Sequence, residues 1–190
     1  AQLDKAGVTY TVCANVHENP SKECVMEAAA AARENHCDFI VALGGGAVLD
    51  AATAVSAMAT NPGELWDYVQ GGTGKGQPLV NQGLPVVTVA TTSGTGSEIN
   101  CWGVISNHET NEKIGFGDPS LVPVLAIVDP ELMKTVPPKY TAYQGFDALF
   151  HNTEVMMSNR VNLMSETLAL SAIEHITKYL PRAVKDGSDL

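Results

Sequence analysis

The stretch at residues 38–59, DFIVALGGGAVLDAATAVSAMA, decides how this chain folds. It opens with an apolar run at 39–43 that does not alternate with polar residues, as is typical of a strand buried on both faces of a parallel sheet. Three glycines at 44–46 follow the run, and residues 47–59 contain helix formers with no breaker. The stretch therefore predicts a strand, a tight glycine turn and a helix.

A glycine turn that leads into a helix places several free backbone N–H groups at one point. Glycine allows a ligand to come close to that backbone, and the helix dipole favours negative charge there. The turn therefore predicts a cradle for the pyrophosphate of a dinucleotide. A plain tight turn between strand and helix is an alternative that three glycines alone leave open, and their spacing differs from G-x-G-x-x-G.

The composition indicates a globular chain. Of its 190 residues 45% are hydrophobic and 17% charged, which is enough for one sizeable core or for one domain with part of another. A net charge of -10 argues against nucleic acid or an anionic membrane as a partner. No apolar run approaches the roughly 18 residues of a spanning helix, and we expect no export signal. The four cysteines form no C-x-x-C pair, so we expect buried free thiols and a cytoplasmic protein.

The segment before the glycine turn begins a β-α-β-α order. Residues 1–6 indicate the last turns of a helix capped by Gly7, and the β-branched residues at 8–16 predict a strand. Ser21 is the expected N-cap of an alanine-rich helix at 22–35. This order predicts an α/β fold with a parallel sheet and helices on both of its faces. Because the chain has no initiator methionine and no strand before residue 8, we expect it to begin inside a longer protein.

A second loop with ligand-binding chemistry follows a second buried strand. Residues 61–81 are rich in glycine, proline and polar residues and predict a loop with a short turn at 65–68. The GKG at 74–76 is not expected to be a P-loop, because the rest of that motif and its strand are missing. The strand at 85–90 is followed by TTSGTGSE at 91–98. Hydroxyl and glycine residues at the end of a parallel strand face the crevice in which such sheets bind ligands.

The chain then predicts a hairpin and a short strand. Residues 102–105 and 113–116 are expected to pair across a loop in which His108 is solvated. Residues 125–128 predict the short strand.

A helical region follows the break at Pro137-Pro138. Apolar residues recur at helical spacing in two segments, 141–158 and 165–180. We therefore expect a dinucleotide-binding α/β domain at 1–137, and the incomplete beginning of a helical domain at 138–190, which the spacing of two of its residues, described next, predicts to be metal-binding.

Asp147 and His151 lie four residues apart within the first of these helical segments. This spacing directs both side chains from one helix face, where a carboxylate and an imidazole can bind the same divalent metal. A simple hydrogen bond between them is the alternative, and two ligands do not complete a metal site. Glu154, one turn further on, is expected to support His151. His175 lies on a separate helix and is assigned no role.

Taken together, these motifs make the chain resemble the iron-containing (group III) alcohol dehydrogenases over nearly its whole length. DFIVALGGGAVLDAAT is similar to the family's GGGS-x-x-D-x-A-K, and GFDALFHNTE is similar to its G-x-D-A-L-x-H-x-x-E. TTSGTGSE followed by VISN and Lys113, and AIVDPELMKTVPP, occur in the family's order. The details are most similar to the butanol dehydrogenase branch, and the resemblance indicates a chain truncated at both ends.

The resemblance implies a Rossmann-like nucleotide-binding domain, whose first strand is missing here, followed by the start of an all-helical domain, with the active site in the cleft between them. Gly45, Gly46 and Ala47 would hold the pyrophosphate of NAD or NADP. Asp147 and His151 would act in catalysis as two of the four protein ligands of a divalent metal, Fe2+ or Zn2+, the other two being histidines beyond Leu190. The further cofactor-binding candidates are Gly44, Asp50, Thr91, Thr92, Thr95, Asn100, Trp102, Lys113 and Leu132.

Three positions depart from the family's pattern. Ala47 stands where the family has serine, which removes a hydroxyl but keeps the backbone cradle. Thr53 stands where the family has lysine, so one cation near the cofactor is lost. Phe150 replaces a threonine before the metal histidine.

The implied activity is hydride transfer between a short-chain primary alcohol, or its aldehyde, and NAD(P), with the metal as a Lewis acid at the substrate oxygen. No protein general base is evident, so we expect a water or ribose relay to carry the proton. The alternatives are a glycerol dehydrogenase or dehydroquinate synthase on the same scaffold, a non-catalytic nucleotide-binding fragment, and a degenerate homologue kept for assembly. The expected partner is a small alcohol or aldehyde, without nucleic acid or membrane, in a homo-oligomer. This chain alone is expected to be inactive, because it lacks two metal ligands.

Overall fold

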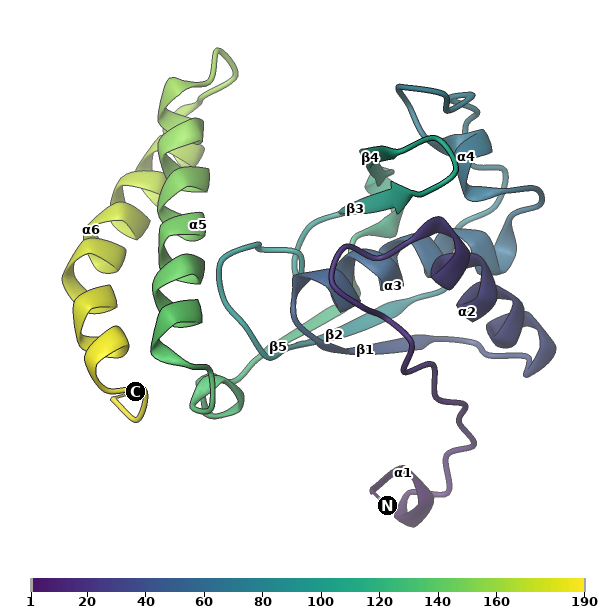
Figure 1. The fold of residues 1–190 in the computed structure, drawn as a ribbon, viewed down its shortest axis with the longest axis horizontal. Helices are drawn as coiled ribbons and strands as arrows, with labels where there is room; N and C mark the ends of the chain where they lie inside the picture. The colour runs from purple at the N-terminus through teal and green to yellow at the C-terminus, as the bar shows by residue number, and fades with distance from the viewer. Residues whose placement is uncertain (1, 190) are drawn as a thin grey trace. The chain divides into compact units, whose positions relative to one another are not determined.

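The computed structural model describes residues 2–189, which form two compact units. The first unit comprises residues 2–89 and 97–127, and the second comprises 90–96 and 128–189. Figure 1 shows the order of the elements along the chain by colour. The second unit thus includes residues 91–96 of the segment TTSGTGSE, which we call the hydroxyl-rich loop, as well as the C-terminal helices. The domain boundary expected near Pro137 stays a prediction.

A three-stranded sheet forms the base of the first unit. Its strands, in spatial order, are β1 (Ile40–Gly44), β2 (Val86–Ala90) and β5 (Leu125–Val128). The N–H of Ile40 donates to the carbonyl of Pro85, and the N–H of Val124 donates to the carbonyl of Val86, both at 2.9 Å. These bonds join the beginnings of neighbouring strands, so all three strands run in the same direction. The predicted α/β class is confirmed.

Two helices pack in succession on one side of this sheet. α3 (Gly46–Thr60) contacts β1 and the hairpin strand β3, and α2 (Lys22–Glu34) packs against α3 (Figure 1). Ser21 caps α2 as predicted, by accepting a 3.2 Å hydrogen bond from the N–H of Cys24. Residues 51–59 of α3 are all buried, because sheet, hairpin and α2 surround this helix.

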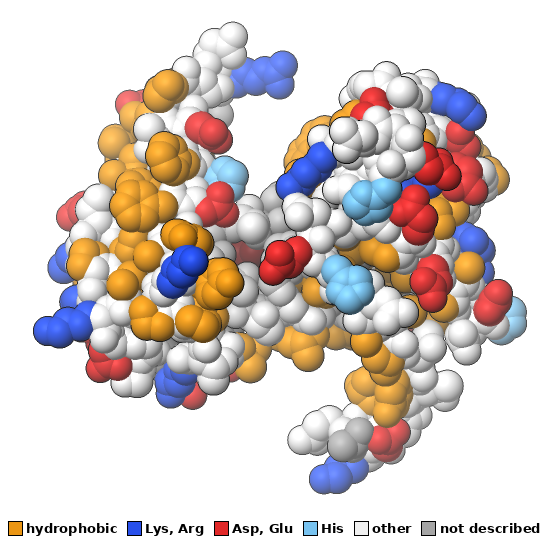
Figure 2. Space-filling model, in the orientation of Figure 1, with side chains coloured by type: hydrophobic (Ala, Val, Ile, Leu, Met, Phe, Trp, Pro, Cys, Tyr) orange, Lys and Arg blue, Asp and Glu red, His pale blue; other side chains and the backbone are white. Residues whose placement is uncertain are grey.

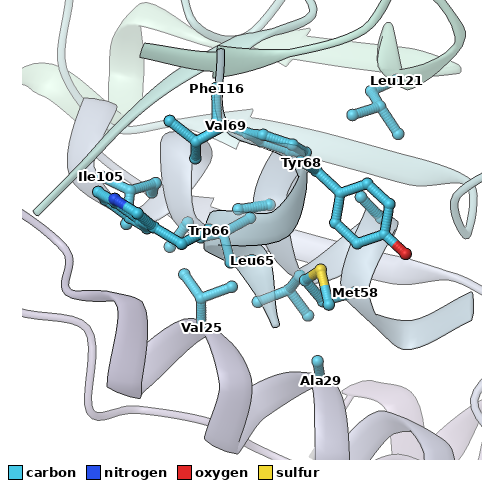
Figure 3. Close-up of a cluster of buried hydrophobic side chains, with 14 residues drawn as sticks. Val25, Ala29, Met58, Leu65, Trp66, Tyr68, Val69, Ile105, Phe116 and Leu121 are labelled. Atoms are coloured by element: carbon cyan, nitrogen blue, oxygen red, sulfur yellow. The ribbon is translucent and has the colours of Figure 1, made fainter. Parts of the chain in front are cut away.

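The core of the first unit lies where α2, α3, the short helix α4 (Leu65–Tyr68) and the hairpin meet (Figure 3). Met58 of α3, Leu65 of α4 and Ile105 of the hairpin are fully buried there. Truncating such a side chain to alanine costs about 2–5 kcal/mol. The turn predicted at 65–68 is therefore a helical turn that contributes to the core.

β3 (Trp102–Asn107) and β4 (Glu112–Gly117) form the predicted antiparallel hairpin. His108 in its turn is exposed, as expected. Gly103 lies directly on α3, because a Cβ there would stand 2.6 Å from the carbonyl oxygen of Asp50. This close approach fixes the hairpin on the helix that follows the glycine turn.

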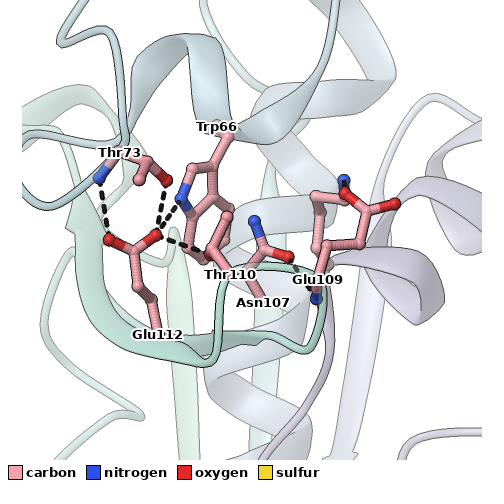
Figure 4. Close-up of polar contacts among 7 residues, drawn as sticks. Trp66, Thr73, Asn107, Glu109, Thr110 and Glu112 are labelled. Carbon is pink, nitrogen blue, oxygen red and sulfur yellow. Dashed lines mark hydrogen bonds and ion pairs between the residues drawn. The ribbon is translucent and has the colours of Figure 1, made fainter.

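Glu112 of β4 forms hydrogen bonds that hold the loop at 70–76 against this hairpin (Figure 4). Its carboxylate accepts bonds from the N–H of Thr73 at 2.8 Å, the hydroxyl of Thr73 at 2.5 Å, the hydroxyl of Thr110 at 2.7 Å and the indole N–H of Trp66 at 3.1 Å. These hydrogen bonds lower the pKa of Glu112 to about 2. Lys75, the lysine of the GKG sequence, is paired with Asp67 at 2.6 Å.

The second unit contains the helices α5 (Pro138–Met157) and α6 (Leu163–Lys185), which pack against each other. Both are longer than predicted. Pro138 fits in the first turn of α5, where no N–H bond is required, and Asn162 caps α6. Hydrophobic side chains gather on the surface of these helices (Figure 2), and Phe150 is 64% exposed.

Short helices complete the described chain: α1 (Gln2–Lys5), η1 (Pro119–Leu121) and η2 (Pro130–Met133). Gly7 follows α1 with a φ of 69°, as expected of a glycine that caps a helix. Ala1, the first residue of the predicted helix tail, lies outside the described residues. No helix within residues 2–189 has both the length and the apolar character that crossing a membrane requires.

The strand predicted at 8–16 is wrong. This segment belongs to neither sheet, and Val12 is 73% exposed. β-Branched residues favour extended backbone, but a strand forms only where a neighbouring strand supplies hydrogen-bond partners.

The prediction that helices cover both faces of the sheet is also wrong for the residues described. α2 packs on α3, where its small residues Ala29 and Ala32 permit close approach and are buried. Val41 and Leu43 of β1 are left 51% and 61% exposed, so the apolar run is not buried on both faces.

The four cysteines carry free thiols, as predicted. Their expected burial is wrong, because Cys13 is exposed and Cys24, Cys37 and Cys101 are only partly buried.

Candidate functional site

The glycine turn leaves the N-terminus of α3 open. Gly45 is the N-cap residue, with φ −84° and ψ −176°; no side chain caps the helix, and its first turn carries no acidic residue. A Cβ at Gly44 would lie 2.6 Å from Cγ2 of Val48, so glycine is what allows β1 to turn so sharply into α3. The N–H groups of Gly46 and Ala47 are therefore available to an anion, and the helix dipole favours one there.

Asp50 connects α3 to the hairpin. Its Oδ2 accepts a 2.9 Å hydrogen bond from the N–H of Val104, and its Oδ1 is buried without a hydrogen-bond partner. Burial raises the pKa of Asp50, although the bonds from Val104 and Ser97 and the charge of Lys113 oppose the rise. These contacts make Asp50 a link within the first unit, and its direct contact with a cofactor stays a prediction.

Lys113 contacts a residue to which the sequence assigned no ligand role. Its ammonium group donates to Oδ1 of Asn19 at 2.6 Å, and Asn19 has a left-handed φ of 55° in the turn before α2. The sequence marks that turn by its Asn-Pro pair but does not indicate a contact 94 residues away. Just before the hairpin, Asn100 accepts a 2.7 Å bond from the N–H of Trp102, whose side chain is 56% exposed.

In the second unit the hydroxyl-rich loop packs on α5. The N–H and the hydroxyl of Ser93 both donate to Oε1 of Gln144, at 3.1 and 3.3 Å. Gly94 lies against α5 at Asp147, since a Cβ at Gly94 would stand 2.9 Å from Oδ2 of Asp147. Gln144 was not predicted, since a lone glutamine on a helix gives no signal of a partner 51 residues away.

Asp147 and His151 share one face of α5, as their spacing predicts. Oδ1 of Asp147 lies 3.5 Å from Nε2 of His151, and Oε2 of Glu154 lies 3.6 Å from Nδ1 of the same ring. All three side chains are 45% or more exposed, so they are accessible to an ion. No cluster of three or more metal-ligating side chains occurs in the described part of the chain. A carboxylate and an imidazole fit a divalent metal as part of a donor set, which further ligands would have to complete.

The candidate site residues divide between the two units. Those of the first unit are Gly44, Gly45, Gly46, Ala47, Asp50, Asn100, Trp102 and Lys113, and those of the second are Thr91, Thr92, Thr95, Leu132, Asp147 and His151. In the first unit, the positive charge of Lys113 acts to lower the pKa of Asp50. In the second, Gly94 of the loop approaches Asp147, while Leu132 lies on η2 and is 41% exposed.

Comparison with known proteins gives one consistent family. The model of the family "Iron-containing alcohol dehydrogenase" matches residues 1–130. The chain is 39% identical over 184 residues to a probable NADH-dependent butanol dehydrogenase of Bacillus subtilis, and this covers 94% of the chain and 46% of that protein. It is 38% identical over 188 residues to a choline dehydrogenase of the same organism, which covers 99% of the chain and 46% of that protein.

A solved structure agrees with these matches. Sulfoacetaldehyde reductase of Bifidobacterium kashiwanohense, crystallised in complex with NAD+, superposes with a TM-score of 0.91 at 34% identity. The match covers 99% of this chain and 50% of that one. The chain therefore spans about half the length of the relatives that it matches.

Proposed function

The chain belongs to the family of iron-containing alcohol dehydrogenases, and from this premise we propose that it supplies the NAD-binding part and the first metal ligands of an alcohol dehydrogenase. The observation that carries the proposal is the open N-terminus of α3, which directly follows a parallel strand and a glycine turn. This arrangement suits the pyrophosphate of a dinucleotide. The relative crystallised with NAD+ supports that choice of cofactor.

The backbone of Gly45, Gly46 and Ala47 holds the pyrophosphate in this proposal. Loss of the family's serine at Ala47 leaves these N–H donors in place. The remaining first-unit candidates, Asp50, Asn100, Trp102 and Lys113, shape the nucleotide side of the site. The hydroxyls of Thr91, Thr92 and Thr95, together with Leu132, are assigned to the nicotinamide and ribose.

Asp147 and His151 are proposed as ligands of a divalent metal, which the family name indicates to be iron. When bound, such a metal supplies Lewis-acid chemistry at an alcohol or aldehyde oxygen. Glu154, at 3.6 Å from Nδ1 of His151, orients the ring so that its Nε2 stays on the side of Asp147. In this proposal the chain contributes two metal ligands, the carboxylate of Asp147 and the imidazole of His151. It also contributes Glu154, which orients the imidazole.

A short-chain primary alcohol, with its aldehyde as the product of hydride removal, is the proposed substrate. The similarity to a butanol dehydrogenase supports this class. No observation on this chain favours the glycerol dehydrogenase, dehydroquinate synthase or non-catalytic alternatives. NADP in place of NAD, zinc in place of iron, a cytoplasmic location and a homo-oligomer stay predictions.

The test uses the longest gene product that contains this sequence. Incubation with butanal and NADH is expected to remove the absorbance of the reduced nicotinamide, and the variant Asp147→Asn is expected to lower the rate at least about a hundredfold. Glu174→Gln on α6 serves as a control, because Glu174 lies outside the candidate site. Unchanged absorbance with the wild-type protein, over a panel of aldehydes with NADH and of primary alcohols with NAD+, would argue against the proposal.

A further inference from the structure

We propose that Gln144 is a positioning residue that holds the hydroxyl-rich loop at 91–96 in a fixed place relative to Asp147. The inference rests on the proposed function, since it gives that loop a cofactor to contact. It concerns residues of the second unit alone. Neither the family's motifs nor the spacing of the site residues assigns Gln144 a role.

One oxygen of Gln144 accepts both donors of a single loop residue. Its Oε1 takes the N–H of Ser93 at 3.1 Å and the hydroxyl of Ser93 at 3.3 Å. Gln144 is partly buried on α5 and lies three residues before Asp147. The N–H bond sets the distance of the loop from the helix, and the longer hydroxyl contact adds to its orientation.

Gly94 makes the second contact of the loop with the same helix. Its φ is +106°, which L side chains rarely adopt, and a Cβ would stand 2.9 Å from Oδ2 of Asp147 and 2.9 Å from the carbonyl oxygen of Gln144. Gly96 provides a contrast, because its φ is +66° but a Cβ there would meet nothing within 4 Å. Close packing therefore requires glycine at 94, whereas at 96 only the backbone conformation requires it.

These contacts determine where the loop's hydroxyls stand. Thr92 precedes Ser93 and Thr95 follows Gly94, so both flank the two residues that are held against α5. A loop held at this point has the backbone next to both threonines held against α5. Because a misplacement of about 1 Å can cost a hundredfold in rate, such a contact has a functional consequence out of proportion to its contribution to stability.

The test compares Gln144→Met, which keeps the length of the side chain but removes the acceptor, with Gln144→Glu, which keeps an acceptor. In the longest gene product that contains the sequence, Gln144→Met is expected to raise the Kd and the KM for NADH about tenfold. The Kd and the KM of Gln144→Glu for NADH are expected to lie much closer to the wild-type values than those of Gln144→Met. The affinity for Zn2+, measured by chelator competition, and the Tm are expected to stay near the wild-type values, since Ser93 is exposed. Gly94→Ala is expected to weaken NADH binding more than Gly96→Ala.

The outcomes separate the two proposals. If the wild-type protein binds no NADH, the proposed function and this inference both fail. If it binds NADH and Gln144→Met binds equally well, only the positioning role fails. A loss of Zn2+ affinity and Tm in parallel with NADH affinity would assign Gln144 to the stability of α5 and would also overturn the inference.

Discussion

The carboxylate of Asp50 on α3 accepts a 2.9 Å hydrogen bond from the backbone N–H of Val104 on β3. This bond joins the helix that follows the glycine turn to the hairpin that carries Lys113. The approach of Gly103 to the backbone of Asp50 tightens the same contact. The N-terminal part of α3 is thus held from the side by a partly buried carboxylate.

Asp50 makes the stability of the chain dependent on pH. Burial raises its pKa, so the folded chain binds this proton more tightly than the unfolded chain does. The contribution of Asp50 is therefore most favourable below its unfolded pKa and is lost as pH rises through the folded pKa. Asp50→Asn, which keeps an acceptor for Val104 without the charge, is expected to gain stability relative to the wild type as pH rises from acid to neutral. Urea unfolding at several pH values measures this difference.

Asp50→Ala is the companion variant. It removes the acceptor of the N–H of Val104, which is exposed and can bond to water, and is expected to cost about 0.5–1.5 kcal/mol. If Asp50→Asn loses stability relative to the wild type as pH rises, or if Asp50→Ala is neutral, the link between α3 and the hairpin is not formed as described.

Glu112 is expected to keep the loop at 70–76 closed. Its folded pKa of about 2 lies below the ordinary value, so its contribution to stability is present above the unfolded pKa and is lost as pH falls through about 2. Glu112→Gln replaces one carboxylate oxygen by an NH2 group, which cannot accept the hydrogen bonds that this oxygen takes from Thr73, Thr110 or Trp66. We expect trypsin to cleave after Lys75 about fivefold faster in this variant, because local opening becomes easier.

Glu109→Gln provides the matched control for this experiment. Glu109 lies on the same hairpin turn but pairs with Lys22 at 2.9 Å instead of contacting the loop. Equal cleavage after Lys75 in both variants would show that Glu112 does not hold the loop.

Glu154 is expected to influence metal affinity through His151. Glu154→Gln removes the negative charge 3.6 Å from Nδ1 and should weaken Zn2+ binding by the longest gene product about tenfold. Chelator competition measures the affinity, with Glu166→Gln on α6 as the control. Identical affinities of wild type and Glu154→Gln would remove Glu154 from the metal site.

Local patterns predicted the parts of the site that are close in sequence. The strand, glycine turn and helix at 38–59 were predictable because the apolar run, the glycines and the helix formers each act within a few residues. The pairing of Asp147 with His151 was predictable because the α-helix repeat fixes it. Contacts between distant segments were not predictable from one sequence, and Ser93 with Gln144 and Lys113 with Asn19 are of this kind.

The incorrect predictions have a related cause. Residues 8–16 have strand composition, but strand formation depends on a partner that composition does not report. The run at 39–43 indicated burial on both faces, whereas Val41 and Leu43 of β1 are exposed. Composition indicates which surfaces can be buried, and the arrangement of elements decides which are.

The affinity for NADH of two variants at Ala47 tests the central claim most directly. Ala47→Glu places a carboxylate in the first turn of α3, which favours the helix but repels a pyrophosphate, and Ala47→Gln has the same size without the charge. A fluorescence titration of the longest gene product is expected to give a Kd at least about tenfold higher for Ala47→Glu than for Ala47→Gln, which is ~1.4 kcal/mol. Equal affinities of the two variants would contradict the claim that this helix N-terminus holds the dinucleotide.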